Sequence, residues 1–182
     1  MCGICGLVNF DGAPVDPSRV ASMTQALIHR GPDDAGTYFN SESPNGPKIG
    51  LGFRRLSIID LAGGHQPMRY KRAAIVFNGE IYNYRELKKQ CESSGHKFQT
   101  QSDTEVILHL YDQFKEGCLE KLNGMFAFAV WDDEKKEIFL ARDRLGIKPL
   151  YYFHEDKKFV QSAKMAKKAL KLRPRTASPG RS

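Results

Sequence analysis

The sequence predicts an α+β fold in which mainly antiparallel sheets carry helices on their outer faces. A chain of 182 residues, 41% of them hydrophobic, is long enough for one domain with a substantial core. Strand-like segments occur in groups between helical ones, without the strict alternation that builds a parallel sheet. The opening segment, MCGICGLVNF, is apolar on both faces, as in a strand buried inside a layered protein.

The first helix is predicted directly after Asp16, which can cap it, with Pro17 at its first position. An apolar stripe at helical spacing follows, and Gly31 supplies the stop. The next segment, IGLGFRRLSIID, is expected to form a strand pair or one bent strand, followed by a GG turn.

A short buried strand, AAIVF, runs into Asn78-Gly79, a pair that usually marks a two-residue hairpin turn. The segment after it, EIYNYRELKKQCESSG, instead places Tyr84, Leu87 and Cys91 at helical spacing. We therefore predict a strand, then Asn-Gly, then a helix.

The segment QSDTEVILHLYDQF is predicted to be a helix with a broad apolar stripe, and its Ser102 and Glu105 have the spacing of a capping box. The long segment GMFAFAVWDDEKKEIFLARDRLGIKPLYYF indicates a strand, a charged turn and two further strands.

The predicted domain organisation is one domain over residues 2–160 and a basic tail over residues 161–182 that is disordered or only partly packed. This tail holds 7 of the 28 lysines and arginines and no acidic residue, so the other 21 basic residues balance the 21 acidic ones. The net charge of +7 therefore belongs to the tail, and a basic groove for nucleic acid is not indicated.

The opening residues have neither the charged region nor the long apolar run of a signal peptide, and no segment is apolar enough for a membrane span. Four cysteines at irregular spacing do not indicate a disulfide framework. A cytoplasmic protein with no nucleic-acid and no membrane partner is predicted.

Cys2 has three possible roles: a nucleophile, half of a metal or redox CxxC pair, or an ordinary buried strand residue. Removal of Met1 is expected before a small residue such as cysteine and would give Cys2 a free α-amine with an ordinary pKa of about 7.7–8. That amine can take the proton of the Cys2 thiol, directly or through one water, so one residue would supply both nucleophile and base.

The CxxC formed by Cys2 and Cys5 is a weaker basis for function. A structural zinc site needs four ligands, and the remaining cysteines are isolated. A redox pair would open a helix after a strand, whereas here the apolar run continues. Alternation along the strand puts Cys5 on the face opposite Cys2, which predicts a buried apolar role for Cys5.

An acyl-transfer nucleophile also needs donors for an oxyanion, and Asn78 with the Gly79 N–H could supply them. Glu80 and Asp103 could hold an α-ammonium group, and Arg55 could hold an α-carboxylate as a fork. Two structural alternatives stay open, because Asp103 could merely complement a helix dipole and Arg55 could sit in a surface ion pair.

Segments spread over residues 2–153 occur in the order found in one known family: MCGI, HRGPD, RRLSIID, FNGEIYNY, SDTEVIL, LNGMFAFAVWD and ARDRLGIKPLYY. In them the chain resembles the class II glutamine amidotransferases, and among these the glutaminase domain of glutamine-hydrolysing asparagine synthetases. Sugar-phosphate amidotransferases of the same class have an RWATHG-like strand in place of RRLSIID. The resemblance implies the N-terminal-nucleophile hydrolase fold, a four-layer αββα sandwich of two mainly antiparallel sheets.

The resemblance also implies the reaction, which is hydrolysis of L-glutamine to glutamate and ammonia through a γ-glutamyl thioester on Cys2. It implies Asn78 and Gly79 as the oxyanion hole, and no metal. The other implied glutamine-binding residues are Arg55, Leu56, Ser57, Ile58 and Ile59 for the carboxylate and backbone, Glu80 and Asp103 for the ammonium group, and, ranked lower, Arg30.

In the family, ammonia passes to a second domain that uses ATP to activate aspartate, and no SGG-type phosphate loop for such a domain occurs in this chain. ATP and Mg would belong to that absent half, so no cofactor is expected here. The expected partners are L-glutamine and a separate ATP-dependent synthetase domain. The segment FVQSAKMAKKALKLRPRTASPGRS departs from the family's pattern, and the alternative function is a truncated or frame-shifted remnant that binds glutamine or a partner without turnover.

Overall fold

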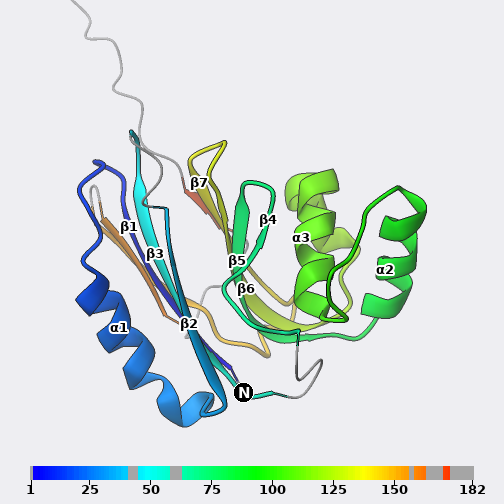
Figure 1. Cartoon of the computed structure of the whole chain (residues 1–182), viewed down its shortest axis with the longest axis horizontal. Coiled ribbons are helices and arrows are strands. Elements are labelled where there is room, and N and C mark those ends of the chain that lie inside the picture. Colours follow the sequence, from blue (N-terminus) through cyan, green and yellow to red (C-terminus); the bar gives the residue numbers. More distant parts are fainter. Residues whose placement is uncertain (1, 41–44, 58–62, 156–157, 163–169, 173–182) are drawn as a thin grey trace, which may run out of the picture.

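Two five-stranded sheets lie face to face, and helices cover their outer faces (Figure 1). The arrangement comes from a computed structural model that describes residues 2–40, 45–57, 63–155, 158–162 and 170–172. Every strand pairing within these residues is antiparallel. The predicted α+β class and the αββα order of layers are both confirmed.

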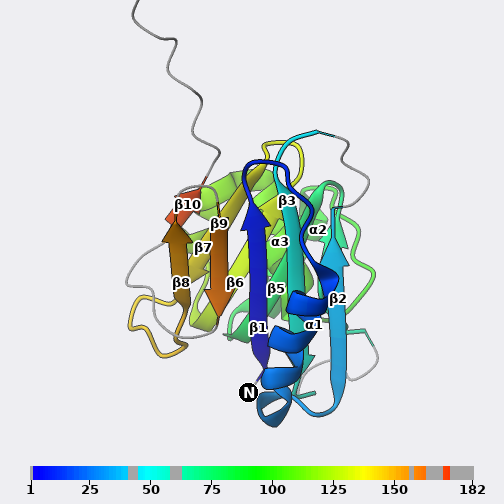
Figure 2. The same ribbon diagram turned by 90° about the vertical axis from the view of Figure 1, so that its left-hand side faces the viewer.

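The first sheet has the opening strand at its centre, between two neighbours that come from distant parts of the sequence (Figure 2). Its strands, in spatial order, are β2 (Asp34–Phe39), β3 (Lys48–Arg55), β1 (Gly3–Asn9), β9 (Lys158–Ser162) and β8 (Tyr151–Glu155). The segment IGLGFRRLSIID contributes one strand that ends at Arg55, and residues 58–62 lie outside the described part of the chain.

The second sheet is built around the strand that carries Asn78. Its strands, in spatial order, are β10 (Leu170–Leu172), β7 (Glu137–Arg142), β6 (Gly124–Asp132), β5 (Ala73–Ile81) and β4 (Met68–Tyr70). Strand β5 is longer than predicted, because Asn78-Gly79 lies inside it, paired with Ala127 and Phe126 of β6. The prediction that this Asn-Gly pair makes no hairpin turn is correct, but its placement at the end of a strand is wrong.

The helices are α1 (Pro17–Ala26), α2 (Tyr84–Ser93) and α3 (Asp103–Phe114), with the short 3₁₀ helices η1 (Ile28–Arg30) and η2 (Lys115–Glu120). Helix α1 begins as predicted, since the Asp16 carboxylate accepts the Ser18 N–H at 2.8 Å and Pro17 is the first helical residue. It ends at Ala26, earlier than predicted, and η1 fills the distance to Gly31.

The capping box predicted for α3 is half correct. Ser102 is the N-cap, and its hydroxyl accepts the N–H of Thr104 at 3.2 Å. The carboxylate of Glu105 reaches past Ser102 to the N–H groups of Gln99 and Thr100, at 2.8 and 2.7 Å. Glu105 therefore anchors the whole loop before α3 and not only its first residue.

Strand alternation divides the buried residues into three layers of core. Between the sheets lie Ile4 and Val8 of β1 with Ala74 and Val76 of β5. In these two strands the odd-numbered residues point outward, so that Leu7 packs under α1, while Ile75 and Phe77 pack under α2 and α3. By the same alternation, Cys2 and Asn78 belong to the layer between the sheets.

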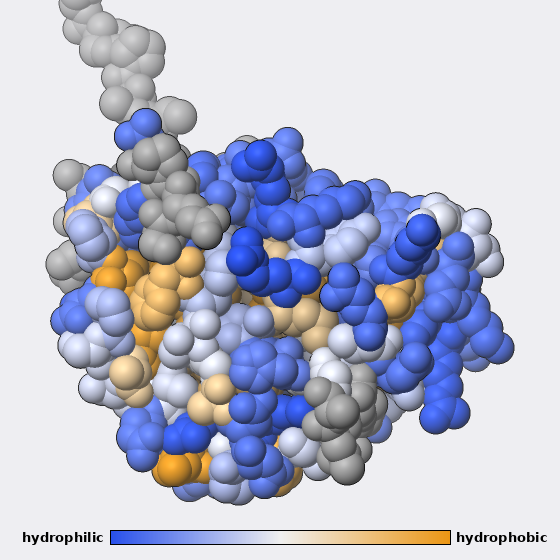
Figure 3. Space-filling model, viewed as in Figure 1, coloured by the Kyte–Doolittle hydropathy of each residue, from blue (hydrophilic) through white to orange (hydrophobic). Residues whose placement is uncertain are grey.

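The predicted tail begins inside the described strands, because β9 runs to Ser162 and pairs with β1, and β10 pairs with β7. The division of the chain at residue 160 stays a prediction. The face seen in Figure 3 is mostly hydrophilic, with hydrophobic residues showing in small patches. Within the described residues, no helix has the length and apolar character to cross a membrane.

Candidate active site

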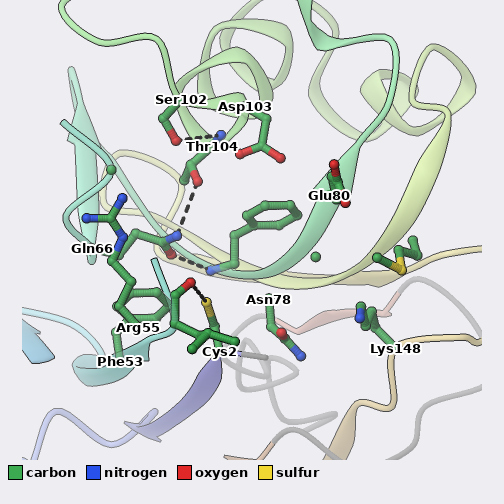
Figure 4. Close-up of a pocket in the computed structure, with 15 residues that line it drawn as sticks. Cys2, Phe53, Arg55, Gln66, Asn78, Glu80, Ser102, Asp103, Thr104 and Lys148 are labelled. Atoms are coloured by element: carbon green, nitrogen blue, oxygen red, sulfur yellow. Dashed lines mark hydrogen bonds between the residues drawn. The ribbon is translucent and has the colours of Figure 1, made fainter. Parts of the chain in front are cut away.

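A cavity of about 110 Å³ lies where the start of β1 approaches β5 and the N-terminus of α3. Its walls come from both sheets and from α3, so it forms only in the folded chain (Figure 4). The residues that line it are Cys2, Phe53, Arg55, Leu56, Gly64, Gln66, Phe77, Asn78, Gly79, Glu80, Ser102, Asp103, Thr104, Met125 and Lys148.

Cys2 stands at the cavity, one residue before β1, and is half-buried. Its thiol lies 3.7 Å from the carbonyl oxygen of Leu56, to which it donates. Burial raises the pKa of the thiol above its usual value, and the positive charge of Arg55 offsets part of this effect. A thiol in this place stays protonated at neutral pH until a base removes its proton.

Asn78 and Gly79 face the cavity from β5. The Asn78 side chain is 1% exposed, and its Nδ2 makes no hydrogen bond within the described part of the chain. Glycine is required at position 79, because a Cβ there would lie 2.3 Å from the Met125 carbonyl oxygen of β6. An unpaired buried donor is costly and marks a place where a ligand oxygen can bind.

Asp103 and Glu80 supply negative charge at another wall of the cavity. Asp103 is the first residue of α3 and is 5% exposed, and its Oδ2 accepts the Ile81 N–H at 3.0 Å. Burial raises the pKa of Asp103 to about 6; hydrogen bonds from Ile81 and Thr104 oppose this rise, and the charge of Glu80 adds to it. A cation bound here would relieve the repulsion between the two carboxylates.

Arg55 and Leu56 line the cavity at the end of β3. Arg55 is only 6% exposed, so it does not sit in an ion pair on the open surface. Ser57 is held by its N–H, which donates to the Asp33 carboxylate at 2.8 Å, but it does not line the cavity. The predicted residues Ile58 and Ile59 lie outside the described residues.

Arg30, in η1, lies behind Cys2 and does not line the cavity. Its Nε donates to the backbone carbonyl of Cys2 at 3.2 Å. Its buried Nη2 has no hydrogen-bond partner within the part of the chain that the structure describes. This contact gives Arg30 a way to orient the nucleophile's residue from outside the cavity.

Cys5 points away from this site, as alternation predicts. It is 1% exposed, and its Sγ lies 3.5 Å from the Thr24 hydroxyl, under α1. Among the described residues, no group of three or more His, Cys, Asp or Glu side chains is placed to hold a metal ion. The buried apolar role predicted for Cys5 is confirmed.

The sequence analysis missed Gln66, Thr104 and Lys148, which also line the cavity. Gln66 and Lys148 sit in loop segments without periodicity, so no pattern singled them out. For Thr104 the only signal in the sequence is its place next to Asp103 at the start of a predicted helix.

A family model described as a glutamine amidotransferase domain matches residues 1–178. The chain belongs to this family. Asparagine synthetases (glutamine-hydrolyzing) 3 and 1 of Bacillus subtilis are 42% and 46% identical to the domain, over 88% and 84% of this chain. A putative asparagine synthetase 2 of Methanocaldococcus jannaschii is 43% identical over 91% of this chain.

The amidotransferase domain covers only part of these relatives: 26% and 24% of the two Bacillus proteins and 34% of the archaeal one. The chain therefore spans about a quarter to a third of the length of the curated relatives it matches.

Solved structures confirm the fold of the amidotransferase domain. The glutamine phosphoribosylpyrophosphate (PRPP) amidotransferase from B. subtilis matches with a TM-score of 0.69 at 24% identity, over 88% of this chain and 41% of that one. The allosteric regulatory enzyme of purine biosynthesis matches with a TM-score of 0.70 at 23% identity, over the same shares. At this level of identity the likeness concerns the arrangement of the layers.

Proposed function

We propose that this domain hydrolyses L-glutamine to glutamate and ammonia through a thioester on Cys2, as the ammonia-supplying half of an asparagine synthetase. One observation carries the proposal: the thiol of Cys2 and the Nδ2 of Asn78, which has no partner among the described residues, lie at one cavity between the sheets, next to the carboxylates of Glu80 and Asp103. A nucleophile, an oxyanion donor and an ammonium site are the parts that hydrolysis of an amino-acid side-chain amide needs.

The substrate is held at its amino-acid end. Asp103 and Glu80 receive the α-ammonium group of glutamine, whose charge stabilises the ionised form of Asp103. Arg55 binds the α-carboxylate, and Leu56 lies along the substrate backbone. These contacts leave the side-chain amide directed toward Cys2 and Asn78.

The first chemical step forms the thioester. With Met1 removed, the free α-amine of Cys2 takes the thiol proton, and the thiolate attacks the δ-carbon of the glutamine side chain. Negative charge develops on the amide oxygen, where the Asn78 Nδ2 and the Gly79 N–H donate to it. The α-ammonium then gives its proton to the departing nitrogen, so ammonia leaves and the γ-glutamyl thioester remains.

The second step releases glutamate. The α-amine, again neutral, takes a proton from a water molecule that attacks the thioester carbon. The same two donors hold the oxyanion, and the bond to sulfur breaks as the proton returns to the thiolate. Both steps reuse one base and one oxyanion site, which is the logic of covalent catalysis.

The ammonia is passed to an ATP-dependent synthetase partner that activates aspartate. The relatives support this, because they are asparagine synthetases of which this chain covers about a quarter to a third. ATP and Mg would bind to that partner. A cytoplasmic location is proposed with it, and it suits the free cysteines that the structure records at positions 2, 5, 91 and 118.

Glutamate release by purified protein tests the function. Cys2→Ala should abolish turnover while glutamine binding, measured by calorimetry, stays within a few fold, because the charged contacts are unchanged. Cys5→Ala is the matched control and should keep turnover. Unchanged hydrolysis in the Cys2→Ala protein would contradict the assignment of Cys2 as the nucleophile. Binding without turnover in the native protein would support the remnant function instead.

A second variant tests the base. An alanine inserted between Met1 and Cys2 keeps the thiol but removes its free α-amine, so turnover should fall nearly as far as in Cys2→Ala. Mass spectrometry gives the N-terminus of each protein. Full activity with residues still attached before the cysteine would contradict the proposed base.

A further inference from the structure

Gln66 is a buried side-chain amide to which the reaction steps assign no role, and it is 4% exposed. Its Oε1 accepts the backbone N–H of Phe77 at 2.7 Å. Its Nε2 donates to the Thr104 hydroxyl at 3.1 Å, and both bonds are drawn in Figure 4. The two polar ends are therefore engaged by different elements, β5 and α3.

The bond to Phe77 takes the place of a backbone hydrogen bond between neighbouring strands. Strand β4 begins at Met68, which is paired with Ile75, so the same register continued would place residue 66 opposite Phe77. The described pairing of β4 with β5 ends at Met68 and does not extend to residue 66. The side-chain carbonyl of Gln66 thus accepts the N–H that a strand backbone would otherwise accept.

The backbone of Gln66 packs closely against the opposite sheet. A Cβ on Gly36 of β2 would lie 2.0 Å from the Gln66 carbonyl oxygen, so only glycine permits this approach. Gln66 consequently touches both sheets and α3 at once. These contacts restrict the position of Gln66 relative to all three elements.

We propose that Gln66 is a positioning residue that sets the separation between the two ends of the glutamine site. Phe77 directly precedes Asn78, the oxyanion donor, and Thr104 directly follows Asp103, the ammonium ligand. This inference rests on the proposed function, which places the two ends of one substrate at these residues. One side chain bonded to both neighbours fixes the distance that glutamine must span.

Gln66 acts through these neighbours and not on the substrate. It lines the cavity, but both of its polar atoms are already bonded to protein. A substrate of fixed length can bind at one end when the separation is wrong, but its amide is then misplaced against the thiol. Misplacement by about 1 Å can cost about 10²-fold in rate.

The decisive variant is Gln66→Met, which keeps the length of the side chain and removes both bonds. We expect kcat for glutamine to fall about 10- to 100-fold, with a change in KM of less than fivefold. The matched control is Asn40→Leu. Asn40 is also buried, accepts the Ile49 N–H at 2.8 Å and donates to the Pro47 carbonyl at 3.0 Å, but lies away from the cavity.

The control separates positioning from stability. Both variants should lower the melting temperature, but Asn40→Leu should leave kcat within twofold of the native value. If Gln66→Met also keeps kcat within twofold, or if both variants lower kcat equally, Gln66 is a structural residue and the proposal is wrong.

A double-mutant cycle with Thr104→Val tests the bridge, meaning the link that Gln66 makes between Phe77 and Thr104. If Gln66 works through the Thr104 hydroxyl, Thr104→Val lowers kcat, and the double variant is no slower than Gln66→Met alone. If the losses in activation free energy caused by the two substitutions simply add in the double variant, the bridge is wrong. Thr104→Val loses a single bond, so it gives an answer even if Gln66→Met does not fold.

Glutamine binding distinguishes this inference from the proposed function. Native protein that binds glutamine but does not hydrolyse it contradicts the function, and the bridge is then judged by affinity: Gln66→Met should weaken binding two- to fivefold, within the limit set for KM, and Asn40→Leu less than twofold. Equal affinities would overturn the bridge. Active native protein with an unaffected Gln66→Met variant would overturn the bridge alone.

Discussion

The side-chain nitrogen of Asn78 is a donor buried without a partner among the described residues, and such a group lowers stability by about 1–3 kcal/mol. A protein keeps this cost where a ligand or a transition state supplies the missing acceptor. In the proposed reaction that acceptor is the oxyanion, which exists only after the thiol has attacked.

Replacing Asn78 by alanine should therefore lower kcat by roughly 10²–10³ with a smaller change in KM, the loss expected for one oxyanion donor. Steady-state glutamate release gives both constants. A nearly unchanged kcat with a large rise in KM would mean that Asn78 binds the substrate before reaction, contrary to its proposed role.

Asp103 provides a prediction about pH, because its buried carboxyl has a pKa of about 6. Only the ionised form attracts the ammonium group of glutamine, so kcat/KM should fall as the pH drops through about 6. In Asp103→Asn this acidic limb of the kcat/KM profile should disappear, while KM at pH 8 rises more than kcat falls. A limb near pH 6 that persists in the variant would assign it to another group.

The same carboxyl affects stability with the opposite sign. Its pKa is raised on folding, so the native state binds the proton more tightly, and stability falls as pH rises from about 4 to 6. The amide of Asp103→Asn can still accept the Ile81 N–H. The variant should therefore melt a few degrees higher than native protein at pH 7, with little difference at pH 4, as calorimetry would show.

At the scale of elements, Glu105 fixes the loop that delivers α3 to the site. Its carboxylate accepts the N–H groups of Gln99 and Thr100 and the Thr100 hydroxyl, the last at 2.6 Å. Burial opposes ionisation of Glu105, but these bonds outweigh it and lower the pKa. The contribution to stability is present above the ordinary pKa and is lost as pH falls through the lowered one.

Glu105→Gln puts an amide nitrogen where the carboxylate accepts, so a buried donor loses its partner and stability should drop by about 1–3 kcal/mol. The expected decrease in melting temperature is about 2–4 °C per kcal/mol. Glu86→Gln, on the exposed face of α2, is the control and should change little. Equal melting temperatures for both variants at pH 7 would contradict this role of Glu105.

The elements also show what the sequence can and cannot predict. The N-cap Asp16, the strand β1 and the alternation that separates Cys2 from Cys5 depend on neighbouring residues, and these predictions are confirmed. The inclusion of Asn78 in β5 depends on pairing with β6, which lies over forty residues later. Gln66 acts through partners 11 and 38 residues away, and no local pattern reveals such contacts.

At the scale of the whole molecule, the C-terminal residues divide into two parts with different expected effects. Strand β10 covers the edge of β7, with Leu170 paired to Leu140, whereas residues 173–182 lie outside the described chain. Removing residues 173–182 should leave turnover and melting temperature unchanged. Removing residues 163–182 should lower the melting temperature, because it exposes an unpaired strand edge.

Differential scanning calorimetry of the two truncated proteins checks this prediction. Equal melting temperatures would mean that β10 adds nothing to the second sheet. In that case residues 163–182 would not contribute to stability, and neither would the basic residues among them.

The side-chain hydrogen bond that Gln66 contributes to the second sheet has a consequence for how such a site can evolve. A spacing set by backbone pairing changes only when residues are inserted or deleted, and such a shift turns every following side chain to the other face of its strand. A spacing set by a side chain changes with one codon, as when Gln66→Asn shortens the link by a single methylene. The strands stay in register while the distance between the two ends of the pocket changes. A single substitution at this position can therefore adapt the pocket to a side-chain amide of another length.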